Sequence, residues 1–287
     1  MELALALSKT GLGRVWPNPS VGCLLVRDGQ VVAQACTGPG GRPHAEQLAV
    51  LQAGELAAGA TAYVSLEPCS HWGVTPPCVL VLQQARVARV VIATRDPDPR
   101  VDGSGVERLR HYGIDVTFGV LEEQARELNA GFMTRLGKGR PLVSAAPASA
   151  AGALYGWAVA TGQDAILVSL EGHRAEKNHG HAVPRVWVDL CGQLDGSPPE
   201  APEPASAQSM FPRWLIHVDG RPLGEIGPVD EVFDVSAVTV AGVQRLDVKA
   251  ALAALGSRGL TRIAVAAADP LTSRLREARL VDRDQEP

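Results

Sequence analysis

Two runs of valine, leucine and other apolar residues lie close together near the start of the chain, with polar residues between them. Residues 21–36 read VGCLLVRDGQVVAQAC, and Asp28-Gly29 separates the two runs. An Asp-Gly pair between such segments is a strong signal for a β-hairpin, because both of its residues tolerate a positive φ. The pattern therefore predicts two adjacent antiparallel strands.

Helical and extended patterns then alternate through the first half of the chain. Strands and helices in this order indicate a sheet with helices on its faces. We expect an α/β domain, with helices at residues 2–13, 45–59, 77–87, 106–113 and 122–136 and strands at residues 60–66, 88–94 and 114–119.

The second half has a weaker pattern. Small residues dominate residues 143–154, and a proline-rich stretch at residues 196–209 is predicted to be a solvated loop. The boundary is expected within GKGRP, residues 137–141, which gives one domain over residues 1–143 and a second α/β domain over residues 144–287. The second domain is predicted to hold strands at residues 164–170, 184–190, 213–218 and 262–268 and a helix at residues 248–259.

The composition narrows the class of protein. The 287 residues carry a net charge of −4 and no long basic run, so we expect no nucleic-acid partner. No apolar stretch reaches the roughly 20 residues of a membrane helix, and the first residues do not resemble a signal peptide, so we expect a cytoplasmic protein with no membrane partner. Five cysteines form a poor disulfide framework, which favours reduced thiols, some of them metal ligands.

Residues 42–48, RPHAEQL, could be a reactive centre or a plain helix start. Taken alone, Glu46 could simply stabilise the N-terminus of the helix, because a carboxylate in the first turn interacts favourably with the helix dipole. His44 together with Cys69 and Cys78 offers one imidazole and two thiolates, a ligand set that leaves the fourth position of a tetrahedral zinc open for water. Zinc lowers the pKa of such a water toward roughly 7, and Glu46 would carry its proton to a departing amine.

A histidine-x-glutamate with a proline-cysteine-x-x-cysteine is the signature of zinc nucleobase deaminases, in which the glutamate is the acid and base and not a ligand. The chain departs from that signature in one respect, because eight residues rather than two separate Cys69 from Cys78. Pro76-Pro77 are typical residues for a new helix start at Cys78.

Several longer stretches resemble the riboflavin-biosynthesis deaminase/reductase (RibD) family. They are PNPSVGCLLVRDGQVV, PHAE, ATAYVSLEPCSHWGVTPPC, ARVVIATRDPDPRVDGSGVERLRHYGIDVTFGV and LNAGF, and they run from residue 1 to about 143 with that family's long cysteine spacing. The resemblance implies a cytidine-deaminase-like three-layer domain, Zn²⁺ on His44, Cys69 and Cys78, and Glu46 as the catalytic proton shuttle. It further implies deamination of diaminohydroxyphosphoribosylaminopyrimidine in riboflavin biosynthesis, Asn18 as a substrate contact, and assembly as a homodimer or homotetramer.

Two positions depart from the family where substrate contacts are expected. Thr37 stands where the family usually has a histidine, and Val74 where it usually has lysine or arginine. Loss of a cation at residue 74 would remove a charge-assisted hydrogen bond, which is typically worth about 1.5–3 kcal/mol.

The second half resembles the family's dihydrofolate-reductase-like domain only in the fragments DAILVSLEG, PRVWVDLCGQL and LAALGSRGLTRIAV. At three positions where the family has a lysine, a serine and an aspartate, this chain has Ala146, Ala150 and Gly152. The family's tryptophan-containing segment is missing between Gln163 and Asp164. The family's glycine-rich turn is replaced by VAAAD, residues 265–269. We therefore expect a truncated, degenerate reductase-like domain that has lost NADPH-dependent reduction of the aminouracil product.

Other interpretations stay open. A zinc-stabilised assembly or structural protein of the same family, or a deaminase for a different nucleobase-like substrate, would keep the same ligands, although a purely structural site does not need Glu46. Cys69 and His71 could also form a cysteine–histidine nucleophile.

The remaining cysteines, histidines and glycines receive simpler interpretations. Cys23 and Cys36 are predicted to be small core residues, and Cys191 is given no special role. The glycines of TGPGGRP, residues 37–43, could cradle a phosphate, but no Walker-type lysine follows. A polar loop is favoured over a second metal site for the histidines His173, His179 and His181.

Overall fold

The computed structural model describes residues 1–150, 154–169, 185–188, 213–218, 231–240 and 243–284. The chain forms two compact units, Met1–Gly137 and Lys138–Pro287. Several predictions therefore lie outside the described residues, namely those for Gly152, His173, His179, His181, Cys191 and residues 196–209.

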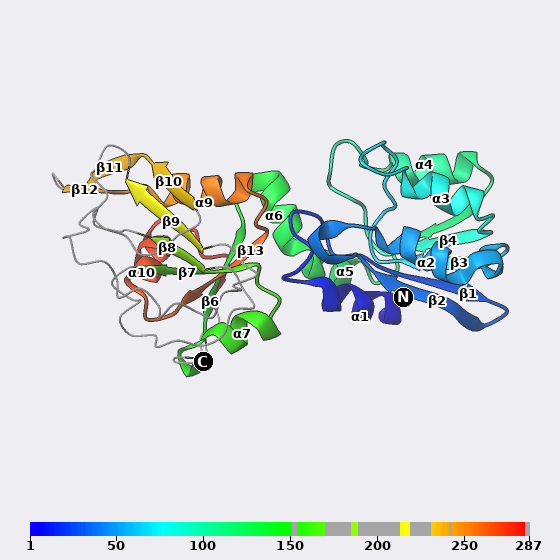
Figure 1. Cartoon of the computed structure of the whole chain (residues 1–287), viewed down its shortest axis with the longest axis horizontal. Coiled ribbons are helices and arrows are strands. Elements are labelled where there is room, and N and C mark those ends of the chain that lie inside the picture. The colour runs from blue at the N-terminus through cyan, green and yellow to red at the C-terminus, as the bar shows by residue number, and fades with distance from the viewer. Residues whose placement is uncertain (151–153, 170–184, 189–212, 219–230, 241–242, 285–287) are drawn as a thin grey trace. The chain divides into compact units, whose positions relative to one another are not determined.

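The first unit contains a five-stranded mixed sheet with the order β2-β1-β3-β4-β5 (Figure 1). β1 pairs antiparallel with β2 and β3, whereas β3, β4 and β5 are parallel. The strands are β1 (Gly22–Arg27), β2 (Gln30–Cys36), β3 (Thr61–Val64), β4 (Arg89–Ile92) and β5 (Asp115–Phe118). The helices are α1 (Glu2–Gly11), α2 (Ala45–Ala53), α3 (Cys78–Gln84), α4 (Ser104–His111), α5 (Glu122–Leu128) and α6 (Ala130–Lys138), with short 3-10 helices at Pro39–Gly41 and Gly54–Ala57.

Helices cover both faces of this sheet (Figure 1). On one face, Ala49 of α2, Leu82 of α3 and Leu109 of α4 belong to the same buried cluster as Leu25 and Ile92 of the strands. On the other face, α1 and α5 pack together through a smaller apolar cluster made of Leu5, Ala93 and Ala125. The expected three-layer α/β arrangement of the first half is confirmed.

The predicted hairpin is also present. Asp28 and Gly29 connect β1 to β2 with φ values of 51° and 77°. Both residues therefore have the positive φ that a tight hairpin turn requires.

The prediction of one continuous helix over residues 122–136 is wrong, because the helix is interrupted between α5 and α6. The interruption falls at Asn129, which is buried and whose side-chain Oδ1 accepts a hydrogen bond from the Ser20 N–H at 3.1 Å. An asparagine that bonds a distant backbone group favours a break over a continuous helix.

The second unit is built on a parallel sheet of seven described strands, in the order β10-β9-β8-β7-β13-β6-β14. Its strands are β6 (Leu142–Ala146), β7 (Ala165–Ser169), β8 (Arg185–Val188), β9 (Arg213–Val218), β10 (Glu231–Val235), β13 (Arg262–Ala266) and β14 (Arg283–Asp284), and β11 (Ala237–Val240) pairs separately with β12 (Val243–Leu246). Its described α-helices are α7 (Leu154–Ala160), α9 (Val248–Ser257) and α10 (Pro270–Glu277). The predicted α/β character of this half is confirmed.

The hydrophobic pattern missed β6 and α7 in the segment of small residues. All five residues of β6 are buried, so the strand has no alternation of apolar and polar positions, and its alanines have little β propensity. Ala146 of β6 and Leu154 and Ala158 of α7 belong to one buried cluster, together with Ile166 and Ala264 of the neighbouring strands. Long-range packing, rather than local propensity, stabilises this part of the fold.

No helix in the described part of the chain is long and apolar enough to cross a membrane.

Candidate functional site

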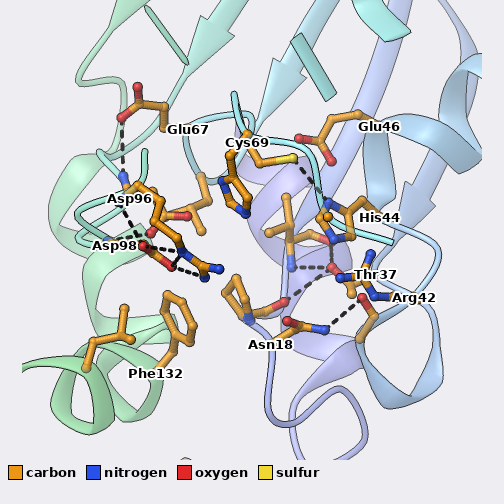
Figure 2. A pocket seen from close by; sticks show the side chains of 18 of the residues that line it. Asn18, Thr37, Arg42, His44, Glu46, Glu67, Cys69, Asp96, Asp98 and Phe132 are labelled. Carbon is orange, nitrogen blue, oxygen red and sulfur yellow. Dashed lines mark hydrogen bonds and ion pairs between the residues drawn. The ribbon is translucent and has the colours of Figure 1, made fainter. Parts of the chain in front are cut away.

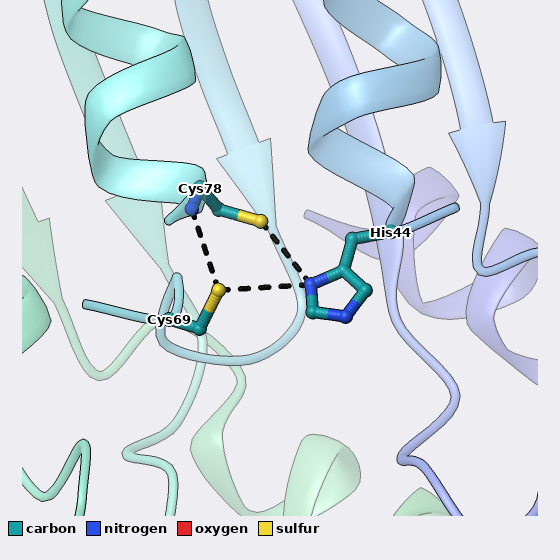
Figure 3. Close-up of side chains that lie close together, drawn as sticks. All are labelled: His44, Cys69 and Cys78. Carbon is teal, nitrogen blue, oxygen red and sulfur yellow. Dashed lines mark hydrogen bonds between the residues drawn. The ribbon is translucent and has the colours of Figure 1, made fainter. Parts of the chain in front are cut away.

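Three side chains that are distant in sequence converge in the first unit (Figure 3). His44 precedes α2, Cys69 follows β3, and Cys78 is the first residue of α3. His44 Nδ1 lies 3.3 Å from Cys78 Sγ and 3.6 Å from Cys69 Sγ. The structure thus brings together the three metal ligands predicted from the sequence.

The spacing of these atoms fits a tetrahedral zinc ion. Zn–N and Zn–S bonds of about 2.05 and 2.3 Å at a tetrahedral angle would separate the nitrogen and each sulfur by about 3.6 Å. The distances of 3.3 and 3.6 Å are close to that value. One imidazole and two thiolates leave one coordination position for another ligand.

The hydrogen bonds among the three side chains favour a thiolate at Cys69. A hydrogen bond from the Cys78 thiol and another from His44 lower the pKa of Cys69 to about 4, although burial opposes them. The same hydrogen bond to Cys69, together with burial, raises the pKa of Cys78 well above its usual value. Metal binding by both sulfurs must therefore release a proton from Cys78.

Glu46 lies in the first turn of α2 and its side chain is directed toward the ligands (Figure 2). Only 3% of the residue is exposed, and this burial raises the pKa of its carboxyl to about 7. A carboxyl group with a pKa near neutral can both accept and donate a proton at physiological pH.

Gln47 joins the two loops that bear His44 and Cys78. Its Oε1 accepts a hydrogen bond from the His44 N–H at 3.2 Å, and its Nε2 donates to the Pro76 carbonyl at 3.3 Å. One side chain thereby holds the start of α2 close to the start of α3.

A pocket lies next to these residues, and several predicted positions line it. Asn18, Thr37, His44, Glu46 and Cys69 all contribute to its wall, and so does His71. Val74, in contrast, is 84% exposed. The structure therefore brings Asn18 and Thr37, but not the Val74 side chain, to the wall of the pocket.

The glycine-rich loop at residues 37–43 is packed against Asn18. Asn18 Nδ2 donates to the Gly41 carbonyl at 3.2 Å. Gly41 has a φ of +84°, and a Cβ at this position would lie 1.9 Å from Asn18 Nδ2. Close approach to Asn18 explains the need for glycine at residue 41.

Several pocket residues were not predicted from the sequence. Asp96, Asp98 and Arg100 come from the segment after β4, Arg42 from the glycine-rich loop, and Phe132 from α6. Charged residues at the carboxyl end of a parallel strand are a recognised signal for a site, and RDPDPR, residues 95–100, follows β4 in this way.

The two other cysteines of the first unit differ in burial. Cys23 is fully buried in the core, which confirms its predicted role. The prediction that Cys36 is a core residue is wrong. Cys36 ends β2 half-buried, with its Sγ 3.8 Å from Ser20 Oγ.

Sequence comparison identifies the same part of the chain. Residues 1–94 match the family model described as the cytidine and deoxycytidylate deaminase zinc-binding region. The riboflavin biosynthesis protein RibD of Aquifex aeolicus is 49% identical over 144 residues, which are 50% of this chain and 40% of that protein. A diaminohydroxyphosphoribosylamino-pyrimidine deaminase of Buchnera aphidicola is 43% identical over 141 residues, 96% of its length.

Structural similarity extends over both units. The RibD structure of Acinetobacter baumannii matches 99% of this chain and 84% of its own, with a TM-score of 0.76 and 28% sequence identity. The second unit is therefore consistent with a reductase-like fold. In sequence, the match to RibD of Aquifex aeolicus spans about two fifths of that protein's length.

Proposed function

Because the chain belongs to the riboflavin-biosynthesis deaminase (RibD) family, we propose that its first unit catalyses zinc-dependent hydrolytic deamination of diaminohydroxyphosphoribosylaminopyrimidine. The observation that carries the proposal is the cluster of His44, Cys69 and Cys78 beside the buried carboxyl of Glu46. A metal that only closed the fold would not need an acid of this kind in the adjacent pocket.

His44, Cys69 and Cys78 would hold the zinc ion through Nδ1 and the two Sγ atoms. Bound zinc would supply a water-derived nucleophile at neutral pH. The ligands themselves are held in position by the Gln47 hydrogen bonds and by the Cys78 N–H, which donates to Cys69 Sγ at 3.3 Å.

Glu46 is proposed to move the proton. Its carboxylate takes a proton from water as the water oxygen bonds to the ring carbon, and then gives that proton to the amine nitrogen as the carbon–nitrogen bond breaks. Ammonia leaves, and the ring keeps the oxygen. Asn18, which lines the pocket and donates a hydrogen bond to the Gly41 carbonyl, is proposed to contact the substrate.

The first experiment measures ammonia release from the pyrimidine by the purified wild type and by Glu46→Ala, with zinc content determined for both. We expect turnover by the wild type and a loss of at least about 10²-fold in the variant, while zinc remains bound. A zinc-loaded wild type that releases no ammonia from this substrate or from free nucleobases would favour an assembly or structural protein.

The second unit is proposed to lack NADPH-dependent reduction. Ala146 and Ala150 provide no charged or hydroxyl group, and Asp269 occupies the N-terminus of α10, where its carboxylate accepts the Leu271 N–H at 2.8 Å. A carboxylate at a helix N-terminus repels an anionic phosphate. NADPH oxidation by the full chain in the presence of 5-amino-6-(5-phosphoribosylamino)uracil would overturn this part of the proposal.

A homodimer or homotetramer and a cytoplasmic location stay predictions for this chain. Sedimentation of the zinc-loaded protein tests the first of them, and a monomer at micromolar concentration would contradict it.

A further inference from the structure

Arg42 brings a guanidinium group to the wall of the pocket. The residue is half-buried, precedes His44 by two positions, and lies on the same side of the pocket as His44 (Figure 2). Its Nη1 donates to Thr75 Oγ1 at 3.4 Å. Arg42 thus connects the glycine-rich loop to the loop that precedes Cys78.

Two aspartates of the pocket lie on the side away from Arg42, whereas Glu46 lies on the same side as His44 and Arg42 (Figure 2). Asp96 and Asp98 are opposite Arg42 in Figure 2. Asp98 is paired with Arg100, whose Nε lies 2.9 Å from Asp98 Oδ1. Over the described residues, no carboxylate forms an ion pair with Arg42. Its positive charge is therefore available to an anionic group of a ligand.

The neighbouring loop provides a glycine rather than a charge beside Arg42. Gly73 lies beside the guanidinium group, since a Cβ at residue 73 would be in ordinary van der Waals contact with Arg42 Nη2 at 3.6 Å. Val74 carries no charge and its side chain is 84% exposed. Arg42 both lines the pocket and contacts this loop, through its hydrogen bond to Thr75.

Resting on the proposed function, we infer that Arg42 binds the phosphate group of the phosphoribosylated pyrimidine and is the residue that selects the phosphorylated substrate over its dephosphorylated form. A guanidinium can donate two parallel hydrogen bonds to phosphate oxygens.

The test compares kcat and KM for ammonia release from the phosphorylated pyrimidine and from its dephosphorylated nucleoside. The proteins are the zinc-loaded wild type, Arg42→Ala, Arg42→Lys and the control Arg110→Ala, which removes an exposed arginine of α4. Loss of a charge-assisted hydrogen bond should lower kcat/KM of Arg42→Ala by about 10- to 100-fold for the phosphorylated substrate, mainly through KM. Arg42→Lys should be intermediate, and Arg110→Ala unchanged.

The nucleoside distinguishes recognition from a merely structural role. Arg42→Ala should deaminate it within about 2-fold of the wild type, because the nucleoside has no phosphate to lose. Equal losses on both substrates, or no loss on either, would overturn the inference while leaving the proposed deaminase intact.

A separate binding measurement covers the case in which the wild type releases no ammonia and the proposed function fails. Calorimetry with ribose 5-phosphate then decides the role of Arg42. Binding by the wild type that is lost in Arg42→Ala supports an anion site, and equal binding by both proteins, or none by the wild type, overturns it.

Discussion

Glu46 and Asp282 are both acidic side chains, yet their surroundings shift their pKa in opposite directions. Glu46 is 3% exposed, and burial raises its pKa to about 7. Asp282 is also largely buried, which raises its pKa, but hydrogen bonds from Arg140 and the Val143 N–H outweigh burial and the net pKa is lowered. Arg140 Nη2 lies 2.8 Å from Asp282 Oδ1.

Asp282→Asn should destabilise the second unit in a pH-dependent way. The lowered pKa of Asp282 means that its carboxylate stabilises the folded state above the unfolded pKa of about 3.9 and loses that effect as pH falls through the folded pKa. At pH 7 the variant should lose about 1–3 kcal/mol of the free energy of unfolding. Urea unfolding at pH 7 and at lower pH should show the difference between wild type and variant shrinking below about pH 4.

The surface pair of Arg89 and Asp115 provides a control for that measurement. Their side chains are 45% and 71% exposed, so Asp115→Asn should change the free energy of unfolding by less than about 1 kcal/mol. Equal effects of the two substitutions would contradict the importance of the Asp282 hydrogen bonds.

At the scale of elements, the start of α4 is packed against the loop that carries Cys69. Glu67 accepts hydrogen bonds from the Gly103 and Val106 N–H groups, each at 3.1 Å. Gly105 leaves room for the chain just before Cys69, because a Cβ at residue 105 would lie 2.3 Å from the Pro68 carbonyl oxygen. The position of Cys69, a proposed zinc ligand, therefore depends on a helix that contributes no proposed ligand.

Gly105→Ala should therefore weaken zinc binding as well as stability. The added methyl group must displace the Pro68 backbone, at a cost of about 1–3 kcal/mol, and Cys69 is the next residue. Zinc content after dialysis against a competing chelator should be lower than in the wild type. Gly137→Ala, a helical glycine whose Cβ would meet nothing within 4 Å, should retain zinc and be neutral or slightly stabilised.

At the scale of the whole molecule, the three proposed metal ligands belong to the first unit and the seven-stranded parallel sheet to the second. The three ligands connect segments of the first unit. In the second unit, Ile166 and Ala264 belong to a buried apolar cluster that contains none of the three proposed ligands. Metal binding therefore contributes its free energy to the fold of the first unit.

Removal of zinc should increase hydrogen exchange near the proposed ligands in the first unit and leave exchange in the sheet of the second unit unchanged. Hydrogen exchange of the full chain, with and without a zinc chelator, should show faster exchange at residues 44–48 and 67–79, because the ligands no longer connect these loops. Exchange in β6, β7 and β13 should stay the same. A uniform increase over both units, or no increase near the ligands, would contradict this prediction.

The sequence by itself determined the ligand types and most of the elements of the first unit. Hairpin residues such as Asp28-Gly29 and the apolar periodicity of the helices are local signals, since they depend on backbone preferences within a few residues. His44, Cys69 and Cys78 were predicted as ligands because their residue types match the zinc-deaminase signature, and because the longer spacing between the two cysteines resembles that of the RibD family.

Only the tertiary structure decided which other residues join the site and where several elements begin or end. Arg42 and Asp98 are ordinary charged residues in the sequence, and they line one pocket because the fold brings the glycine-rich loop and the segment after β4 to opposite sides of it (Figure 2). The break at Asn129 depends on Ser20, which is 109 residues away, and β6 is a strand because parallel neighbours bury it. Contacts of this kind arise from long-range packing, which overrides local propensity and leaves no trace in a short stretch of sequence.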